Sequence, residues 1–505
     1  MSSRRSFLQT SAAGAAAAGL SQIDLFSKLP RVSADEAKPD PKVVRFSAEI
    51  EPLVKLIEET PREKLLEEVG ARIKKGASYR EVLAALMLAG VRNIQPRPSV
   101  GFKFHSVLVV NSAHLASLSS PDEYRWLPIF WALDQFKSGQ AADVQEGNWT
   151  MAPVEESAIP PAHKAAKALT EALDRWDEGA TDAAAASIAR TATAGEAFEI
   201  FARYGARDFR DIGHKAIYTA NAFRTLQCIG WQHAEPVLRS LAYALLAHRG
   251  EGNPAENDFP ADRPGKDNLS RVKKLRDDWQ EGKVDDGATR EILAGIRSAN
   301  PSDMANLVVE VINRGIAPQS IWDGLFVGSG ELLMRQPGIV GLHTLTSSNA
   351  LRYAYDNTAS DELRRWLLLQ NAAFLTMFRD AMKSRGKIGD GNIAELAPGE
   401  LPPGEDSLAK VFDAVSNDKA AAARLALAYA QANPEPSGFI QRARLLTFLK
   451  GKDSHDYKFS SAVLEDYRHL SPGWRDRYLA ASVFNLRGSS GPDVPIVART
   501  KQALT

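Results

Sequence analysis

Residues 74–133 read KKGASYREVLAALMLAGVRNIQPRPSVGFKFHSVLVVNSAHLASLSSPDEYRWLPIFWAL, and residues 313–372 read NRGIAPQSIWDGLFVGSGELLMRQPGIVGLHTLTSSNALRYAYDNTASDELRRWLLLQNA. The second stretch repeats the first, because identical residues recur 239 positions apart and, across one deletion, 238 positions apart. The matched pairs are Gly76 and Gly315, Leu86 and Leu325, Asp122 and Asp361, Glu123 and Glu362, Arg125 and Arg364, His105 and His343, Asn111 and Asn349, and Ala116 and Ala354. A duplicated chain usually closes two similar halves around a shared centre, so polar residues kept in both halves indicate where a site lies.

The spacing of apolar residues predicts helices almost throughout the chain after residue 45. Apolar side chains recur at three and four positions, which is the period of an amphipathic helix, while the alternation typical of strands is scarce. Val107–Val110 is β-branched enough to suggest a strand, but its copy at 345–348 is not. The sequence therefore predicts an all-α fold, either a tandem-duplicated helical repeat array or a two-lobed helical bundle.

The repeat continues within each half of the chain. GHKAIYTANAFRTL (213–226) aligns without gaps onto residues 341–354, and HDYKFSSAVLEDY (455–467) is a weaker fourth copy. Four related helical units in two halves follow from this alignment. We expect a signal peptide at 1–34, one helical half at 45–248, a charged connector at 249–289 with a helix at 270–281, a second helical half at 290–488 and a loose tail at 489–505.

The first residues match an export signal. Ser3-Arg4-Arg5-Ser6-Phe7-Leu8 has the pattern of a twin-arginine signal, followed by an Ala/Gly-rich run and by Val32-Ser33-Ala34, a small-residue cleavage site. The sequence therefore predicts a partnership with the twin-arginine export machinery and a periplasmic or otherwise exported protein. That route carries proteins that are already folded, often with a cofactor inserted, so the signal favours a cofactor without naming one.

The bulk composition excludes several classes of function. The chain has 505 residues, of which 44% are hydrophobic and 25% charged, as in soluble globular proteins. The 62 Lys and Arg residues balance the 62 Asp and Glu residues, so no overall field favours nucleic acid. Cys228 is the single cysteine, which excludes an internal disulfide. No segment is long and apolar enough to predict a membrane span in the mature protein.

Histidines at equivalent places in the units are the main candidates for chemistry. His105 and His343 occupy one column of the repeat, His214 lies one position away because Lys215 aligns with His343, and His455 joins the column in the fourth copy. Imidazoles facing one centre suit zinc, iron or copper, and they can also serve as catalytic acids or bases. The competing interpretation is that a histidine at a helix start only caps or packs.

A second repeated pattern places amides and cations on one helix face. Asn111, Asn221 and Asn349 share a column, with Ser461 in the fourth copy, and a cation or imidazole follows three residues later. Residues three apart lie on the same side of a helix, where they can orient an anionic or carbonyl-bearing substrate. They can equally bond one helix to the next. The partners at the third position are His114, Arg224 and Arg352.

Other signatures of known chemistry are missing from the sequence. There is no phosphate-binding loop, no nucleophile elbow and no HExxH or CxxC motif. Gly328-Ser329-Gly330 lacks the third glycine of a dinucleotide-binding turn, and we interpret it as a helix break. The absence of these motifs leaves the repeated histidines and asparagines as the only candidate site.

FKFHSVLVVNSAH (102–114), with GHKAIYTANAF (213–223) and GLHTLTSSNALRYAY (341–355), resembles the His-bearing helices of the questin oxidase-like family. The resemblance implies a helical protein, and some members are assigned to Baeyer–Villiger-type oxidation of aromatic polyketides with a reduced nicotinamide cofactor. The resemblance implies that His105, His214 and His343 are functional residues. The export signal departs from that family and argues against a soluble nicotinamide cofactor.

These patterns lead to two hypotheses about function. In the first, the protein is an exported oxidoreductase with a polar pocket between its halves. The four repeated histidines bind a transition metal there or exchange protons. The asparagines and arginines orient a small molecule. In the second, it is a non-catalytic binding or scaffold protein of the cell envelope, with the asparagines bonded only to neighbouring helices. A hydrophobic-ligand carrier is a third, weaker alternative. The sequence does not decide whether the protein is an enzyme.

Overall fold

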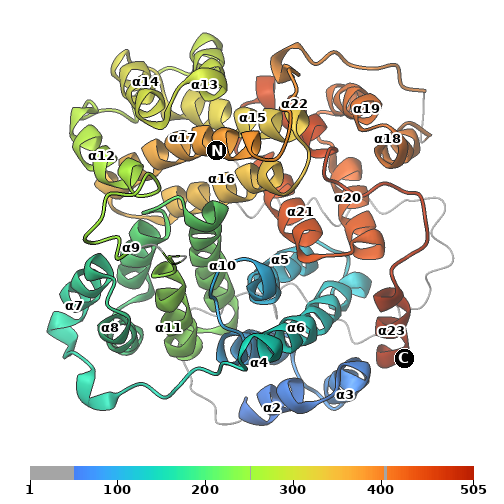
Figure 1. Ribbon diagram of the computed structural model, residues 1–505. Coiled ribbons are helices and arrows are strands. Elements are labelled where there is room, and N and C mark those ends of the chain that lie inside the picture. The colour runs from blue at the N-terminus through green and yellow to red at the C-terminus, as the bar shows by residue number, and fades with distance from the viewer. Residues whose placement is uncertain (1–49, 249, 251, 403–405) are drawn as a thin grey trace.

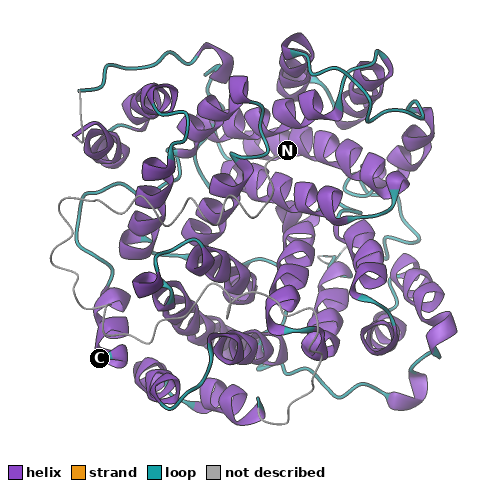
Figure 2. Ribbon diagram, turned by 180° about the vertical axis from the view of Figure 1, so that it is seen from behind, coloured by secondary structure: helices purple, strands orange, loops and turns teal. Residues whose placement is uncertain are grey.

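The computed structural model describes residues 50–505 apart from 249, 251 and 403–405, and these residues are built almost entirely of helices joined by loops (Figures 1 and 2). The described part contains no β-strand beyond one isolated bridge between Lys283 and Ile316. The predicted all-α class is therefore confirmed, and Val107–Val110 lies inside a helix. The predicted signal peptide at 1–34 lies outside the described residues.

Four helices form a closed ring in the middle of the molecule. They are α5 (His105–Leu118), α10 (His214–Ile229), α16 (Ile339–Asn357) and α21 (Ser454–Asp466). Both α5 and α16 pack against α10 and against α21, so the ring closes between the first and fourth members (Figure 1). These helices are the four segments that align as repeats in the sequence, and they come from widely separated parts of the chain.

The four ring helices bring their N-terminal parts together. Their histidines meet near the N-terminal ends, since the rings of His105 and His455 lie 4.5 Å apart. Further along, Ser461 Oγ on α21 donates to the carbonyl of Ser112 on α5. On the opposite side, Asn349 of α16 bonds to acidic residues near the end of α21. The histidines near the starts of all four helices therefore lie together.

Each ring helix is followed by a helix that packs against it. These following helices are α6 (Trp126–Glu146), α11 (Ala234–Leu245), α17 (Asp361–Lys383) and α22 (Pro472–Ser482). Because they lie outside the ring, α5 is covered on most sides, and most of its hydrophobic residues together with Asn111 and His114 are buried. The core thus surrounds the ring and fixes the positions of its polar residues.

The remaining helices surround this double layer. They are α2 (Glu51–Glu59), α3 (Arg62–Lys74), α4 (Tyr79–Asn93), α7 (Ala162–Arg175), α8 (Glu178–Thr191), α9 (Ala194–Gly205), α12 (Arg263–Arg271), α13 (Asp286–Ser298), α14 (Pro301–Asn313), α15 (Pro318–Arg335), α18 (Asp406–Asn417), α19 (Lys419–Ala432), α20 (Ser437–Lys450) and α23 (Pro495–Leu504).

Two predictions for the second half of the chain differ from the structure. The tail expected to be loose contains α23, which packs against α3 and α6 and is anchored by a salt bridge of 2.9 Å between Arg499 and Asp134. Gly328-Ser329-Gly330 lies inside α15 and does not break it. A Cβ at Gly328 would come within 2.4 Å of Ile296 Cδ1, so glycine here lets α13 approach α15 closely.

The connector also differs from its prediction. Its helix α12 ends at Arg271, so most of the predicted helix at 270–281 is a 3-10 turn followed by irregular chain. The irregular part is anchored by Trp279, which is buried and donates through Nε1 to Asp361 at 2.8 Å. The buried side chains Val272, Leu275 and Trp279 are three and four residues apart, which matches the period of a helix although most of this segment is irregular, so periodicity misled the prediction.

Candidate metal centre

The four repeated histidines come together at the N-terminal end of the ring. His105 and His214 are the first residues of α5 and α10, His455 is the second residue of α21, and His343 lies in the second turn of α16. Ring centroids of neighbours around the cluster are 4.4 to 5.3 Å apart, and the diagonal from His105 to His343 is 6.4 Å. The imidazoles therefore form a square with one member from each ring helix.

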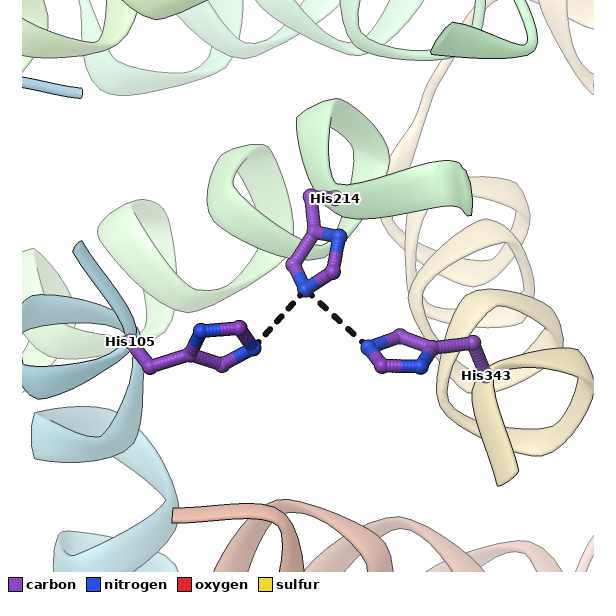
Figure 3. A group of neighbouring side chains, drawn as sticks. All are labelled: His105, His214 and His343. Atoms are coloured by element: carbon purple, nitrogen blue, oxygen red, sulfur yellow. Dashed lines mark hydrogen bonds between the residues drawn. The ribbon is translucent and has the colours of Figure 1, made fainter. Parts of the chain in front are cut away.

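Three of these histidines point their Nε2 atoms at one another (Figure 3). Nε2 of His214 lies 3.0 Å from Nε2 of His105 and 3.0 Å from Nε2 of His343. The ligand atoms of the three residues all lie within 4.8 Å of one another. His214 and His343 are buried and His105 is half-buried, so the cluster lies mostly inside the protein.

The other ring nitrogen of each histidine fixes the tautomer. Nδ1 lies against a backbone carbonyl in all three, at 2.9 Å from Phe102, 2.5 Å from Asp211 and 2.5 Å from Ile339. A carbonyl can only accept, so Nδ1 carries the hydrogen and a neutral ring presents the lone pair of Nε2 to the cluster. Three lone pairs facing one another cannot satisfy each other, whereas a cation between them can. The same outer hydrogen bonds orient histidine ligands in metal sites.

The backbone before two of the helices is held in an unusual conformation. Phe102 and Asp211, whose carbonyls accept from the histidines, have φ values of 47° and 51°, and Ile212 has 47°. Left-handed backbone at residues with a side chain costs about 1–3 kcal/mol each and tends to be kept at functional sites. Here it turns a carbonyl toward Nδ1 three residues later in both loops, so the strain serves to orient His105 and His214.

The two loops also support each other. Ser99 Oγ donates to Asp211 Oδ1 at 2.9 Å, and the backbone N–H of Val100 donates to Asp211 Oδ2 at 3.1 Å. Gly101 then passes so close to the cluster that a Cβ there would lie 3.3 Å from Cε1 of His105 and 3.5 Å from Cε1 of His214. The loop preceding α5 is therefore built around the two imidazoles.

His455 completes the square in a different way. Its Nδ1 lies 3.3 Å from Oδ1 of Asp453, which also caps the N-terminus of α21 and whose pKa falls to about 2 because of the hydrogen bond to His455. Its Nε2 is buried and has no hydrogen-bond partner among the described residues. A carboxylate behind one ring nitrogen and an unpartnered second nitrogen suit a fourth ligand.

Burial keeps the clustered imidazoles neutral. It lowers the pKa of His105, His214 and His343 well below the usual value, and the nearby charge of Lys458 lowers it further. Nζ of Lys458 lies 3.4 Å from Nε2 of His214, and burial lowers the pKa of this lysine to about 7. Neutral imidazole is the form that binds a metal ion.

A small polar pocket lies between the same four helices and is partly open to solvent. Lys458 lines it, so the pocket adjoins the histidine cluster. Four of the predicted substrate-binding residues line it as well. The lining consists of Asn111, Ser112, Leu115, Ile217, Asn221, Arg224, Thr346, Asn349, Ala350, Lys458, Ser461 and Ala462.

The pocket asparagines also bond one helix to another. Asn111 Nδ2 donates to Asn221 Oδ1 at 3.2 Å, and Asn221 Nδ2 donates to the carbonyl of Leu108 at 3.0 Å. These hydrogen bonds join neighbouring helices, as the second hypothesis expects. They leave the buried Oδ1 of Asn111 as an acceptor without a partner among the described residues.

The predicted pattern does not bring all its members into the pocket. Arg352 donates to Asp356 at 2.8 Å and lies over the ring of Trp322, outside the pocket lining. Nδ1 of His114 lies 2.9 Å from the hydroxyl of Tyr79, and burial lowers the pKa of this histidine to about 4. Both side chains have structural partners away from the cluster.

Sequence reasoning missed Lys458 and an acidic pair at the far end of the pocket. Asn349 Nδ2 donates to Glu465 at 2.8 Å and to Asp466 at 2.7 Å, and Arg224 forms a salt bridge of 2.9 Å with Glu465. Burial, with the charge of Glu465, raises the pKa of Asp466 well above its usual value. The available signal was the spacing of Lys458 three residues after His455, on the same helix face.

Comparison with known protein families, with characterised proteins and with solved structures finds no match for this chain. Within residues 50–505, leaving out the five undescribed positions, every helix is too short or too polar to cross a lipid bilayer.

Proposed function

We propose that the four ring histidines bind one transition-metal ion and that the protein is an oxidoreductase whose small polar substrate occupies the adjoining pocket. The observation that carries the proposal is the convergence of three Nε2 lone pairs, with each Nδ1 bonded to a backbone carbonyl. An all-imidazole donor set suits zinc, copper, iron or nickel rather than magnesium or calcium.

The donor set is compatible with a redox-active metal, because copper, iron and nickel bind imidazole as zinc does. His105, His214, His343 and His455 would hold such an ion, which supplies one-electron chemistry, while the protein orients the substrate and limits water access.

Metal content measured on the full-length protein tests the proposal. Apo protein loaded separately with copper(II), iron(II) and zinc(II) should retain about one ion per chain, and electron paramagnetic resonance of the copper form should show nitrogen ligation. His214→Gln should weaken binding at least 10-fold, because it removes the nitrogen shared by both short contacts. The exposed His163→Gln is the matched control. Retention of less than 0.1 ion per chain by the wild type would refute the metal centre.

Turnover separates the two hypotheses about function. A metal-loaded protein that cycles its metal between oxidation states with a small-molecule donor is an oxidoreductase, while one that binds metal or a ligand without redox change is a binding protein. The large exposed apolar side chains in the described residues are Phe102, Val144, Leu269 and Val284, on separate elements, so they do not form the broad groove that a scaffold would use.

Export through the twin-arginine pathway is part of the same proposal. The site is assembled from four distant segments, so it exists only after folding, and a route for folded cargo would let the metal be inserted first. Arg4→Lys together with Arg5→Lys should leave the protein in the cytoplasm in cell fractionation. Unchanged export of this variant would contradict the assignment. The resemblance to the questin oxidase-like family remains a prediction that an assay of aromatic ketone oxidation can test.

A further inference from the structure

Lys458 is a buried cation, and its hydrogen-bond partner, Nε2 of His214, is also a proposed ligand of the metal. Its side chain is buried, and within the described part of the chain its one hydrogen bond is the 3.4 Å contact with Nε2 of His214. That nitrogen lone pair is the one that a metal would take. Once the metal is bound, the ammonium group would be left without an acceptor in the protein interior, which is costly for a charged group.

The charges around the cluster balance this cation only in part. The candidate ligands themselves are neutral histidines, and the group contains no carboxylate. The charge of Asp453 raises the pKa of Lys458, but this carboxylate faces Nδ1 of His455. Asp211 accepts from Ser99 and Val100. The N-terminal ends of the ring helices add further positive potential. A divalent ion here would therefore create a strongly positive, buried centre.

The lysine is placed to share a ligand with the metal. A metal about 2.1 Å from Nε2 of His214 lies within roughly 5.5 Å of Nζ of Lys458, given the 3.4 Å contact. One ligand atom on the metal can thus accept a hydrogen bond from the ammonium group. Lys458 also lines the pocket, where the buried Oδ1 of Asn111 has no partner among the described residues and can accept from a hydroxyl group of the occupant.

We propose that the metal centre binds a small anion, such as a hydroxylated carboxylate, between the metal and Lys458 on the side that faces the pocket. The inference rests on the proposed metal site and names the class of its ligand. The anion replaces water on the metal, its charge offsets the ammonium group, and its remainder extends toward Asn111. No covalent change of the anion is needed for this binding step.

Azide titration of the copper(II)-loaded full-length protein tests the inference through the azide-to-copper charge-transfer band. Lys458→Met and Lys458→Gln replace the lysine with uncharged side chains of similar length. Both should bind azide at least 10-fold more weakly than the wild type, because a hydrogen bond to a charged group is lost. Glycolate should compete with azide, and Asn111→Ala should weaken glycolate more than acetate.

Lys419→Met is the matched control, because Lys419 is also a lysine whose pKa burial lowers, to about 8, but it bonds to the carbonyls of Val483 and Leu486 in a different region. It should leave azide affinity unchanged. Metal content is measured in each sample, so loss of the metal centre and loss of the anion site give different results. Azide affinity within 2-fold of wild type at full copper occupancy, or loss of copper from both Lys458 variants, would overturn the inference.

Discussion

Two buried lysines on opposite helices of the ring, α10 and α21, have different surroundings. Lys215 on α10 is fully buried, with its Nζ 2.9 Å from Oδ2 of Asp208, and Arg210 nearby is paired with Asp262. Lys458 on α21 is just as buried, and its one hydrogen bond among the described residues is with the imidazole of His214, while the charge of Asp453 also acts on it. The first arrangement pairs the lysine directly with a carboxylate and joins α10 to its supporting loop, whereas the second gives the lysine no salt bridge within the described part of the chain. Burial alone therefore does not distinguish the two lysines, but direct pairing with a carboxylate does.

Removing the carboxylate of Asp208, which is the counter-charge of Lys215, should have the largest effect on stability. Asp208→Asn would leave Lys215 with no carboxylate in contact beside Arg207 and Arg210, and breaking a buried pair in this way costs about 3–5 kcal/mol of unfolding free energy. Chemical denaturation followed by circular dichroism measures the change. Asp258→Asn, which removes an exposed partner of Arg263, should cost less than about 0.5 kcal/mol. Equal effects of the two substitutions would contradict the distinction between the lysines.

Replacing each lysine with methionine should change stability in opposite directions. Lys458→Met removes a buried charge that is compensated only in part, so the metal-free protein should gain about 1–3 kcal/mol. Lys215→Met leaves the Asp208 carboxylate without its closest partner, so it should lose about 1–3 kcal/mol. The same denaturation experiment in the presence of a chelator compares them. If both variants lose stability, then Lys458 has a protein partner in solution and the comparison fails.

The histidine ring shows how far the sequence alone could lead. The repeat placed His105, His343 and His455 in one column, and the structure brings all three together. The alignment put Lys215 rather than His214 in that column, because α10 needs one more residue between its histidine and its asparagine than the other helices do. Neighbouring residues on a helix point about 100° apart, so the structure sends His214 into the ring and Lys215 to Asp208.

Other parts of the site could not be found from the repeat. Lys458 has Leu108, Tyr218 and Thr346 at the equivalent positions of the other helices, so no other unit carries a cation there and a search for shared charged columns does not find it. The carbonyls that fix the histidine tautomers depend on left-handed backbone at Phe102 and Asp211, which no local preference of these residues predicts. Features unique to one unit, and features of the backbone, therefore required the folded structure.

Acid titration distinguishes the two lysine environments by their dependence on pH. Burial alone would raise the pKa of Asp208, but Lys215, Arg207 and Arg210 outweigh it and hold this pKa below the usual carboxyl value. The unfolded state then binds more protons, so the contribution of Asp208 is complete above the unfolded pKa of about 3.9 and is lost as the pH falls through the folded pKa. Stability measured from pH 6 to pH 2.5 should fall less steeply in Asp208→Asn than in the wild type, whereas the exposed Asp258→Asn should follow the wild type. Lys458→Met should also reduce the slope, but for a different reason, because it removes a charge that lowers the pKa of three buried histidines. Identical slopes in the wild type and Asp208→Asn would contradict this.

The smallest expected effect comes from the loop that holds the histidines rather than from a charge. Gly101→Ala places a methyl group 3.3 Å from both Cε1 of His105 and Oγ of Ser99, so the imidazole must shift by a few tenths of an ångström. Because such supporting contacts set the position of metal ligands, copper affinity should fall by up to about 10-fold, with less than about 1 kcal/mol change in stability. Gly179→Ala in α8, where the nearest atom lies 4.0 Å away, is the control and should leave copper affinity unchanged. An affinity loss in the control, or none in Gly101→Ala, would mean that the loop does not position His105. Copper binding would then not depend on how this loop orients the imidazoles, and the charges around the two lysines would remain the main difference between the two regions.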